Sequence, residues 1–510
     1  MTSTVLLVAL AVVVAFLLLV AVYDLVQRKH AILRNFPIVG HFRYMLEAVG
    51  PELRQYIVTD NNEEKPFSRD DRRWVYSTAK QQNSYFGFGT DNDLDQSRNY
   101  TIIKQSMFPL DGPVDAPIHP DPSRLLPCAK VLGASHNRRF AFRPKSIVNV
   151  SGMSFGALSG AAIEALDRGC QIAGALHTTG EGGVTVHHLH GADLIWQIGT
   201  GYFGCRNEDG SFNLEQAVAQ TQAAPIRAIE IKLSQGAKPG LGGLLPGKKV
   251  TPEIAAIRGV PVGRDCKSPA AHSAFSDVAS LIDFVEVLAE ATGLPVGIKA
   301  AVGQSEFWNE LATRMAVTGQ GPDFITIDGG EGGTGAAPLA FSDHVSLPFR
   351  WGFTRVYRCF AEVGITDDVV FIGSGKLGLP DAAFSAIALG CDMVNVGRTA
   401  LFSIGCIQSQ RCHTDRCPTG VATQNRRLSR GLDPTDKGVR CGNYLAGVRF
   451  ELERLSWACG VTHPAKVTAD MIEVLEDRWT AETLREMVGY EPSWGTPSQS
   501  LLDELDALSG

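Results

Sequence analysis

The stretch that decides the fold is residues 146–180, SIVNVSGMSFGALSGAAIEALDRGCQIAGALHTTG. It opens with a short β-rich run at 146–152, passes through a helical stretch at 159–173 and returns to a β-rich run at 174–180. A strand, a helix and a second strand in this order form a βαβ unit, whose two strands lie parallel. The stretch therefore predicts an α/β fold.

The same alternation continues as far as residue 398. Six further β-rich runs follow, at residues 194–201, 228–234, 294–300, 323–330, 369–375 and 392–398. Helical stretches, such as residues 276–293, lie between most of them. Eight strands that alternate with helices favour a closed parallel sheet over an open one. We therefore predict a (β/α)8 TIM barrel over residues 146–400, with its active site at the carboxyl ends of the strands.

The composition suits a large, well-buried enzyme. The chain has 510 residues, of which 44% are hydrophobic and 53 are glycine, and this combination is typical of a packed core with many tight loops. A net charge of −7 is mild and gives no reason to expect nucleic-acid binding. The 11 cysteines are odd in number and scattered, which indicates a reducing compartment rather than a disulfide framework.

The N-terminus carries an uninterrupted run of apolar or small residues from 5 to 22. A run of this length reaches the lower limit for a membrane-spanning helix. A signal peptide is the alternative, but no basic segment precedes the run and no cleavage pattern follows it. Basic residues follow the run: Arg28, Lys29, His30 and Arg34. By the positive-inside rule, we expect residues 1–24 to be a single-pass anchor that leaves the catalytic part in the cytoplasm.

The remaining segments are assigned by their position around the barrel. Residues 25–145 are expected to form a segment that wraps the barrel. Residues 401–465 would form a cysteine-containing loop followed by helices, and residues 466–510 would form C-terminal helices and an acidic tail.

Three cysteines cluster in the loop after the eighth strand, GCIQSQRCHTDRCPTGVATQ at residues 405–424. They are Cys406, Cys412 and Cys417, and a proline follows the last one. Closely spaced thiolates suit iron–sulfur clusters, and three cysteines fit a 3Fe–4S cluster better than a four-cysteine cubane. A zinc site that uses His413 and a set of reduced structural cysteines remain as alternatives.

Glycine-rich strings end the seventh and eighth strands, where barrels of this type usually bind a phosphate. The strings contain Gly373, Ser374, Gly375, Lys376, Gly397 and Arg398. Ordinary turn chemistry is the alternative explanation, since loops between strands and helices favour glycine. Lys232 alternates with the apolar Ile231 and Leu233 at the end of the fourth strand, so its side chain is predicted to face the barrel mouth.

The ordered motifs of residues 100 to 465 resemble the flavin domain of glutamate synthase. The motifs are SGMSFGALS (151–159), TGEGG (179–183), IEIKLSQGAKPGLGGLLPGKKV (229–250), GGEGGTGAAP (329–338), GSGK (373–376) and the cysteine loop with its C-x5-C-x4-C spacing. In that family the loop holds a three-iron cluster. Because six motifs occur in the family's order, the resemblance is specific.

The resemblance implies that the barrel binds FMN. It places the backbone around Ser151, Met153 and Ser154, together with the side chain of Gln197, against the isoalloxazine ring. It places Lys232 near N1 and the C2 carbonyl, where a cation stabilises the reduced flavin.

The resemblance also implies a site for 2-oxoglutarate or a related keto acid. The family binds this substrate with a lysine and an arginine at the spacing of Lys238 and Arg258, and Gln235 lies beside them. Two carboxylates require two fixed cations, and arginine suits a bidentate contact. Glu331 matches an acidic position of the family and completes the predicted substrate residues.

Lys232 and Glu181 are the predicted catalytic residues, Glu181 because it matches an acidic position of the family. The chain departs from the family pattern at Leu241 and Leu244, which replace a carboxylate and an amide. Only His272 remains of a histidine pair. These departures bear on the ammonia tunnel and on the identity of the keto acid.

The predicted reaction is reduction of the imine that forms from the keto acid and ammonia or a small amine. No G-x-G-x-x-G dinucleotide fingerprint opens a strand-turn-helix unit, so the expected electron donor is a ferredoxin or an NAD(P)H-oxidising subunit. No class II glutaminase precedes the barrel in this sequence, and a separate glutaminase is a possible partner.

Two other functions remain open at this point. One is a membrane-linked amino-acid or amine dehydrogenase that passes electrons from FMN through the cluster to a quinone or another carrier. The other is a non-catalytic electron-transfer or scaffold subunit, against which Lys232, Lys238 and Arg258 argue.

Overall fold

The computed structural model describes most of the chain, in two compact units: Met1–Asp71 and Arg72–Gly510. The described residues are 2–27, 31–54, 58, 64–90, 92–94, 97–112, 119–477 and 479–509. Arg28, Lys29 and His30, on which the expected membrane orientation depends, lie outside the described residues.

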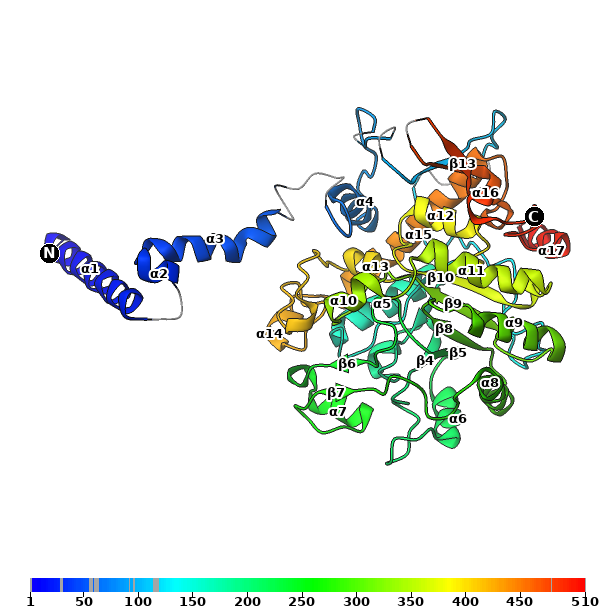
Figure 1. Cartoon of the computed structure of the whole chain (residues 1–510), viewed down its shortest axis with the longest axis horizontal. Helices are drawn as coiled ribbons and strands as arrows, with labels where there is room; N and C mark the ends of the chain where they lie inside the picture. The colour runs from blue at the N-terminus through cyan, green and yellow to red at the C-terminus, as the bar shows by residue number, and fades with distance from the viewer. Residues whose placement is uncertain are drawn as a thin grey trace. The chain divides into compact units, whose positions relative to one another are not determined.

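The second unit is built around a closed barrel of eight parallel strands (Figure 1). In chain order the strands are β2 (Val148–Val150), β3 (Leu176–Thr178), β4 (Asp193–Ile198), β5 (Ile226–Lys232), β8 (Val296–Ala300), β9 (Phe324–Asp328), β10 (Val370–Ser374) and β11 (Met393–Val396). The last strand returns to the first, with Val396 opposite Val150. The predicted TIM barrel is therefore confirmed, and each strand lies within or overlaps one of the predicted β-rich runs.

Helices cover the outside of the barrel, and Figure 1 shows α8, α9 and α11 outside strands β8 to β10. These helices are α5 (Gly160–Ala173), α6 (Leu214–Ala223), α8 (Val278–Thr292), α9 (Glu306–Thr318), α11 (Phe349–Glu362), α12 (Pro380–Ala388), α13 (Arg398–Ser403) and α15 (Pro434–Ala458). Helix α5 shows how the local sequence sets where a helix begins and ends. Ser159 accepts a hydrogen bond from the Ala162 N–H at the N-terminus of α5, and Gly174 ends the helix with φ 62°.

Shorter elements lie outside the eight barrel strands. They are β6 (Leu244–Leu245), α7 (Pro252–Arg258), β7 (Cys266–Lys267), α10 (Leu339–His344) and α14 (Arg426–Ser429). A three-stranded antiparallel sheet joins the chain before the barrel to the chain after it: β1 (Tyr100–Ile103), β12 (Ile472–Leu475) and β13 (Ala481–Thr483). Helices α16 (Leu484–Val488) and α17 (Gln499–Ser509) end the chain. The domain boundaries expected at residues 145 and 465 stay a prediction.

The first unit contains α1 (Thr2–Val26), α2 (Ala31–Asn35) and α3 (Val39–Leu53), and α4 (Arg69–Ala79) begins at its end. Among the described residues, α1 is the one helix long and apolar enough to cross a membrane, over Thr4–Val26 with a mean hydropathy of 3.5. The most hydrophobic 18-residue stretch of this helix is not buried against other parts of the structure.

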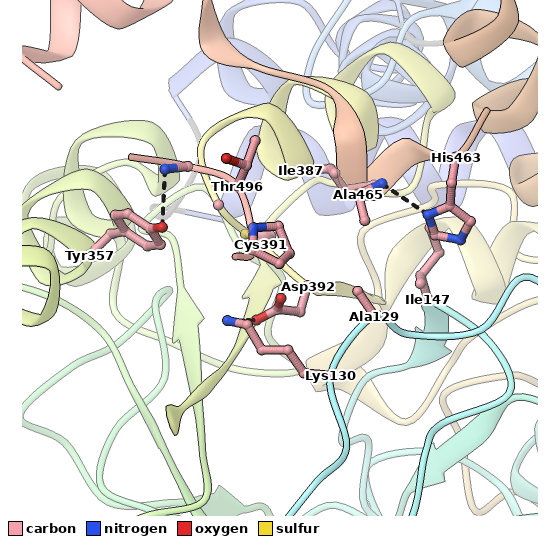
Figure 2. Close-up of a pocket in the computed structure, with 13 residues that line it drawn as sticks. Ala129, Lys130, Ile147, Tyr357, Ile387, Cys391, Asp392, His463, Ala465 and Thr496 are labelled. Carbon is pink, nitrogen blue, oxygen red and sulfur yellow. Dashed lines mark hydrogen bonds and ion pairs between the residues drawn. The ribbon is translucent and has the colours of Figure 1, made fainter. Parts of the chain in front are cut away.

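The amino-terminal face of the barrel is fixed by a buried ion pair (Figure 2). Lys130 Nζ lies 2.9 Å from Asp392 Oδ2 and also donates to the carbonyl oxygens of Thr366 and Val369, which precede β10. Only 5% of the Lys130 side chain and 4% of the Asp392 side chain are exposed. The adjacent cavity has a volume of about 10 Å³, which is room for a single water molecule. This ion pair therefore contributes to stability, and the cavity beside it is too small for an organic ligand.

Replacing Lys130 with methionine should destabilise the barrel strongly. The change leaves the Asp392 carboxylate buried without its cation, which costs about 3–5 kcal/mol. The matched control is Lys104→Met, because Lys104 pairs with Glu473 at the surface, 3.2 Å away with both side chains 38% exposed. The control should cost about 1 kcal/mol or less. Thermal and denaturant unfolding followed by circular dichroism would measure both, and equal losses would contradict the role given to Lys130.

Candidate functional site

Polar side chains gather at the carboxyl ends of the strands, the opposite end of the barrel from the cavity of Figure 2. Lys232, the last residue of β5, extends its Nζ to within 3.1 Å of Glu181 Oε1, from the loop after β3. The same Nζ donates to Gln235 Oε1 at 3.0 Å. The structure thus brings both predicted catalytic residues and one predicted substrate residue into direct contact.

Two glycines make room for the Glu181 carboxylate. A Cβ added at Gly199 would lie 2.5 Å from Glu181 Oε2, and one added at Gly243 would lie 2.5 Å from Oε1. These separations are far shorter than any ordinary contact, so a side chain at either position would displace the carboxylate from Lys232. Gly199 and Gly243 are therefore needed for close approach of the carboxylate rather than for a turn.

Three cations surround this one carboxylate. Burial by itself would raise the pKa of the Glu181 carboxyl, but Lys232, Arg258 and Lys238 outweigh burial, and the pKa is lowered. Burial and the neighbouring Lys232 lower the pKa of the Lys238 ammonium, whereas Glu181 partly restores it. The Glu181 carboxylate is thus shared by three cations.

Arg258 is held in place from several sides. It ends α7, whose N-terminus is capped by Thr251. Its Nη2 donates to the Phe155 carbonyl oxygen at 2.9 Å, and its guanidinium carbon lies 5.1 Å from the centre of the Phe203 ring. Within the described part of the chain, its buried Nε has no hydrogen-bond partner. A buried donor without a partner is costly, and a bound anion would satisfy it.

Lys238 is also buried at the mouth. Its Nζ donates to the Ala336 carbonyl oxygen at 2.9 Å, so the loop after β9 holds it. A backbone carbonyl leaves two of the three ammonium protons available for other acceptors. Lys238 and Arg258, which the sequence predicts to bind a substrate, therefore lie at the same end of the barrel and beside Glu181.

The barrel interior contains a polar group that the sequence analysis missed. Glu230, on β5, is buried and accepts hydrogen bonds of 2.6 Å from both Gln197 Nε2 and Thr326 Oγ1. These bonds orient Gln197, a predicted flavin contact, toward the barrel axis. The sequence did contain a signal for this network, a glutamate in the middle of the apolar run AIEIK. Because an unpaired charge in a buried strand is unfavourable, Glu230 could have been expected to have hydrogen-bond partners.

The sequence analysis also missed an ion pair at the carboxyl ends of the strands. Lys299 on β8 lies 3.1 Å from Asp328 at the end of β9, and Asp328 also accepts a hydrogen bond of 3.0 Å from the Gly236 N–H. Burial opposes both charges, but the pairing raises the pKa of Lys299 and lowers the pKa of Asp328. A lysine and an aspartate at the carboxyl ends of adjacent strands were the signal for this pair.

The predicted flavin residues lie on neighbouring loops. Ser151 follows β2, and its N–H donates to Val396 at the end of β11. A Cβ added at Gly180 would lie 2.5 Å from the Ser154 nitrogen, so the loops after β2 and β3 pack tightly and fix Met153 and Ser154.

The predicted phosphate residues follow strands seven and eight as expected. Gly373 and Ser374 end β10, Gly375 has φ 117° and Lys376 has φ 58°. A Cβ added at Gly397 would meet nothing nearer than Ser151, at 3.9 Å, so the space directly beside Gly397 is open. Arg398 donates a hydrogen bond to the Glu331 carbonyl oxygen at its edge. An open cradle of backbone beside a guanidinium fits a phosphorylated cofactor.

Glu331, a predicted substrate residue, makes a structural contact. Both of its carboxylate oxygens accept hydrogen bonds from the Phe349 N–H, at 3.0 and 2.8 Å, at the N-terminus of α11. Burial raises the pKa of this carboxyl despite that bond. Its contact with a substrate stays a prediction.

The three predicted metal ligands lie in one loop after α13. Burial, with a contribution from Cys412 and Cys417, raises the pKa of the Cys406 thiol to about 12, so the thiols are near enough to influence one another. Their chemistry suits iron and sulfide. Across the described residues, however, no group of three or more histidine, cysteine, aspartate or glutamate side chains is arranged to hold a metal ion. The cluster therefore stays a prediction.

Hydrogen bonds tie the cysteine loop to the loop after β2. Lys249 Nζ donates to the carbonyl oxygens of Ala157, at 2.9 Å, and Cys412, at 3.1 Å. Gln424 Nε2 donates to the Leu158 carbonyl oxygen at 2.7 Å. The loop that carries the predicted flavin contacts and the loop that carries the cysteines are thus directly joined, which the sequence did not predict.

The closed barrel and the ionisable cluster at its mouth are those of a TIM-barrel enzyme. The family model described as the conserved region in glutamate synthase matches residues 128–462. This range covers well over half of the chain, so the chain belongs to the glutamate synthase family and is an oxidoreductase of that family.

Two relatives that are similar in sequence agree with this assignment. The glutamate synthase large subunit-like protein YerD of Bacillus subtilis is 38% identical over 467 residues, which cover 86% of this chain and 88% of the relative. The archaeal glutamate synthase (NADPH) of Methanocaldococcus jannaschii is 37% identical over 320 residues, 62% of this chain and 59% of that protein. Among solved structures, a mutant flavocytochrome b2 with pyruvate bound covers 91% of this chain and 90% of its own, at 14% identity and a TM-score of 0.42.

Proposed function

We propose that this protein reduces the imine of 2-oxoglutarate, or a closely related dicarboxylic keto acid, and ammonia or a small amine to the amino acid. The observation that carries the proposal is the set of three cations, Lys232, Lys238 and Arg258, that act on the single Glu181 carboxylate at the barrel mouth. A substrate with two carboxylates suits a site in which several fixed cations share one carboxylate of the protein.

FMN is the cofactor that the family and the open cradle beside Arg398 support. When bound, FMN would supply the hydride for the imine carbon. The residues that would hold it are Ser151, Met153, Ser154, Gln197, Lys232, Gly373, Ser374, Gly375, Lys376, Gly397 and Arg398. Among these, Lys232 provides a fixed cation whose position is set by Glu181 and Gln235.

The chain's own residues bind and orient the reactants. Arg258 and Lys238 hold the carboxylates of the keto acid, so that its carbonyl carbon faces the barrel axis. Because its pKa is lowered, Glu181 stays ionised near neutral pH and can stabilise the protonated imine, which carries a positive charge. The buried loops around it exclude water, which would otherwise hydrolyse the imine.

We further propose a 3Fe–4S cluster on Cys406, Cys412 and Cys417, which would supply electrons one at a time. The donor chemistry of the three thiols supports it, and so do the bonds from Lys249 that join the cysteine loop to the loop after β2. The source of the electrons would be a reduced ferredoxin or an NAD(P)H-oxidising subunit, and a separate glutaminase would supply ammonia.

The membrane location is likewise a proposal. Helix α1 would anchor the chain as a single span, with the barrel in the cytoplasm. A membrane position would also suit the reverse reaction, an amine dehydrogenase linked to quinone.

The deciding assay measures glutamate formation by the purified full chain. It compares 2-oxoglutarate with ammonium, methylamine or glutamine, with a dithionite-reduced dye as the electron source. Amino-acid formation with ammonium or methylamine supports the proposal. Dye reduction by amino acids without any synthesis would favour the dehydrogenase, and inactivity in both directions would contradict an enzymatic role.

Replacing Arg258 with lysine should weaken keto-acid binding while leaving the flavin content unchanged. Lysine keeps the charge but loses the fork that a carboxylate accepts, so the KM for 2-oxoglutarate should rise about ten- to hundredfold, or ~1.5–3 kcal/mol. Arg264→Lys, at an exposed position a few residues on, is the control and should leave KM unchanged. Equal loss of flavin and substrate binding would mean that Arg258 supports the fold instead.

Keto-acid binding should also depend on pH through Lys238. Its pKa lies below that of an ordinary lysine, so the cation is lost at a lower pH, and KM should rise as the pH rises through that lowered pKa. Glu181→Gln removes the charge that partly restores this pKa, so the rise should begin at still lower pH. Lys238→Met should have a high KM without this dependence. A pH profile of KM that is identical in all three proteins would rule out the assignment.

Replacing Cys412 with serine should remove iron but keep flavin. The wild-type chain should contain about three iron atoms, and the variant should retain most of its FMN because the predicted phosphate loops lie on other elements. Cys359→Ser, on α11, is the control and should keep its iron. Metal analysis and flavin absorbance provide the measurement. Stoichiometric zinc in place of iron would refute the cluster.

A further inference from the structure

Helix α3 carries an apolar stripe that the structure leaves uncovered. Phe42, Leu46, Val49 and Leu53 follow one another at spacings of four, three and four residues, which places them on one face of the helix. Met45 lies beside them. The exposed fractions of these five residues are Phe42 59%, Met45 52%, Leu46 46%, Val49 44% and Leu53 38%. Five large exposed apolar side chains on one short helix need a covering surface.

A corner of the chain, held by hydrogen bonds to Asp24, joins the start of α3 to the end of α1. Asp24, in the last turns of α1, is buried and accepts hydrogen bonds from the Ile38 N–H and from His41 Nε2, both at 2.9 Å. Ile38 has φ 66°, which is strained for a β-branched residue. Such a conformation persists only where the surroundings hold it, and here the Asp24 carboxylate does so. The start of α3 is therefore fixed to the end of α1.

This corner determines which surface covers the stripe. The candidate span Thr4–Val26 has 23 residues and is about 34 Å long at ~1.5 Å per residue, enough to cross a hydrocarbon layer of about 30 Å. Asp24 is near the C-terminal end of that helix, so it would lie at the boundary between hydrocarbon and water. Because α3 starts at the same place, its uncovered stripe lies within reach of the lipid surface.

The charged residues Arg43 and Glu47 on the polar face of α3 pair with each other. Arg43 pairs with Glu47 at 2.8 Å, one helical turn away, and the two charges cancel. A helix with an apolar stripe on one face and polar, charged residues on the other suits the boundary of a lipid bilayer, where the apolar face is buried and the polar face meets headgroups and water.

We infer that α3 lies in the plane of the membrane surface, with its apolar stripe in the boundary between headgroups and acyl chains. The inference rests on the proposed membrane anchoring by α1. In this arrangement α1 spans the bilayer, α3 rests on it, and the Asp24 corner turns the chain from one direction to the other. The partner of the stripe is thus lipid, and the membrane contact extends from α1 to residue 53.

The test uses the full chain in phosphatidylcholine vesicles that contain lipids brominated on their acyl chains. Bromine quenches tryptophan only at short range, and all seven native tryptophans lie at residue 74 or beyond, so the wild-type chain provides the background. Phe42→Trp should be quenched at least threefold more than Tyr44→Trp, the matched control on the opposite face of α3. Adding Leu46→Glu and Val49→Glu to Phe42→Trp should remove most of that quenching.

A third reporter separates this inference from the anchor. Phe16→Trp lies in the middle of α1 and reports whether that helix is in the bilayer. Quenching of Phe16→Trp with none at Phe42→Trp would overturn the inference and leave the anchor intact, whereas quenching at neither would overturn both. If Phe42→Trp is shielded from aqueous acrylamide but not quenched by brominated lipid, another protein surface covers α3 and the inference is wrong. The imine-reduction assay has no bearing on these results.

Discussion

Closure of the parallel barrel between β11 and β2 is the constraint on which the rest of the structure depends. All eight strands run in the same direction, so closure brings all of their carboxyl ends to one rim. Glu181 follows the second barrel strand, Lys232 ends the fourth and Asp328 ends the sixth, yet all three lie at this rim. Without closure, the carboxylate and the cations that define the site would lie along the edge of a wide sheet.

The two ends of the barrel use buried charge differently. At the amino-terminal face, Lys130 pairs with Asp392, and Arg138 contacts both Glu286 and Asp323, so each of these charges has a partner within the protein. At the mouth, three cations, Lys232, Lys238 and Arg258, act on the single Glu181 carboxylate. Charges paired within the protein contribute stability and order, whereas cations that share one carboxylate can accept a further anion. This asymmetry is why the small cavity of Figure 2 is not the candidate site.

The fold and part of the site could be predicted from the sequence because the signals are local. The alternation of β-rich and helical runs predicted every strand of the barrel, and the resemblance to glutamate synthase predicted the family to which the chain belongs. Lys232 was correctly expected at the mouth, because alternation along β5 fixes its direction. The Glu230, Gln197 and Thr326 network was missed, because its partners come from three strands whose register no local pattern reveals.

The sequence by itself determined the order of the strands, the identity of the charged residues that end them and the apolar run of α1. Tertiary structure alone decided which charges meet. It placed Gly199 and Gly243 against the Glu181 carboxylate, and it joined the cysteine loop to the loop after β2 through Lys249. The physical reason is range: periodicity and turn chemistry act over a few residues, whereas contacts between loops depend on barrel closure and side-chain packing across the whole chain.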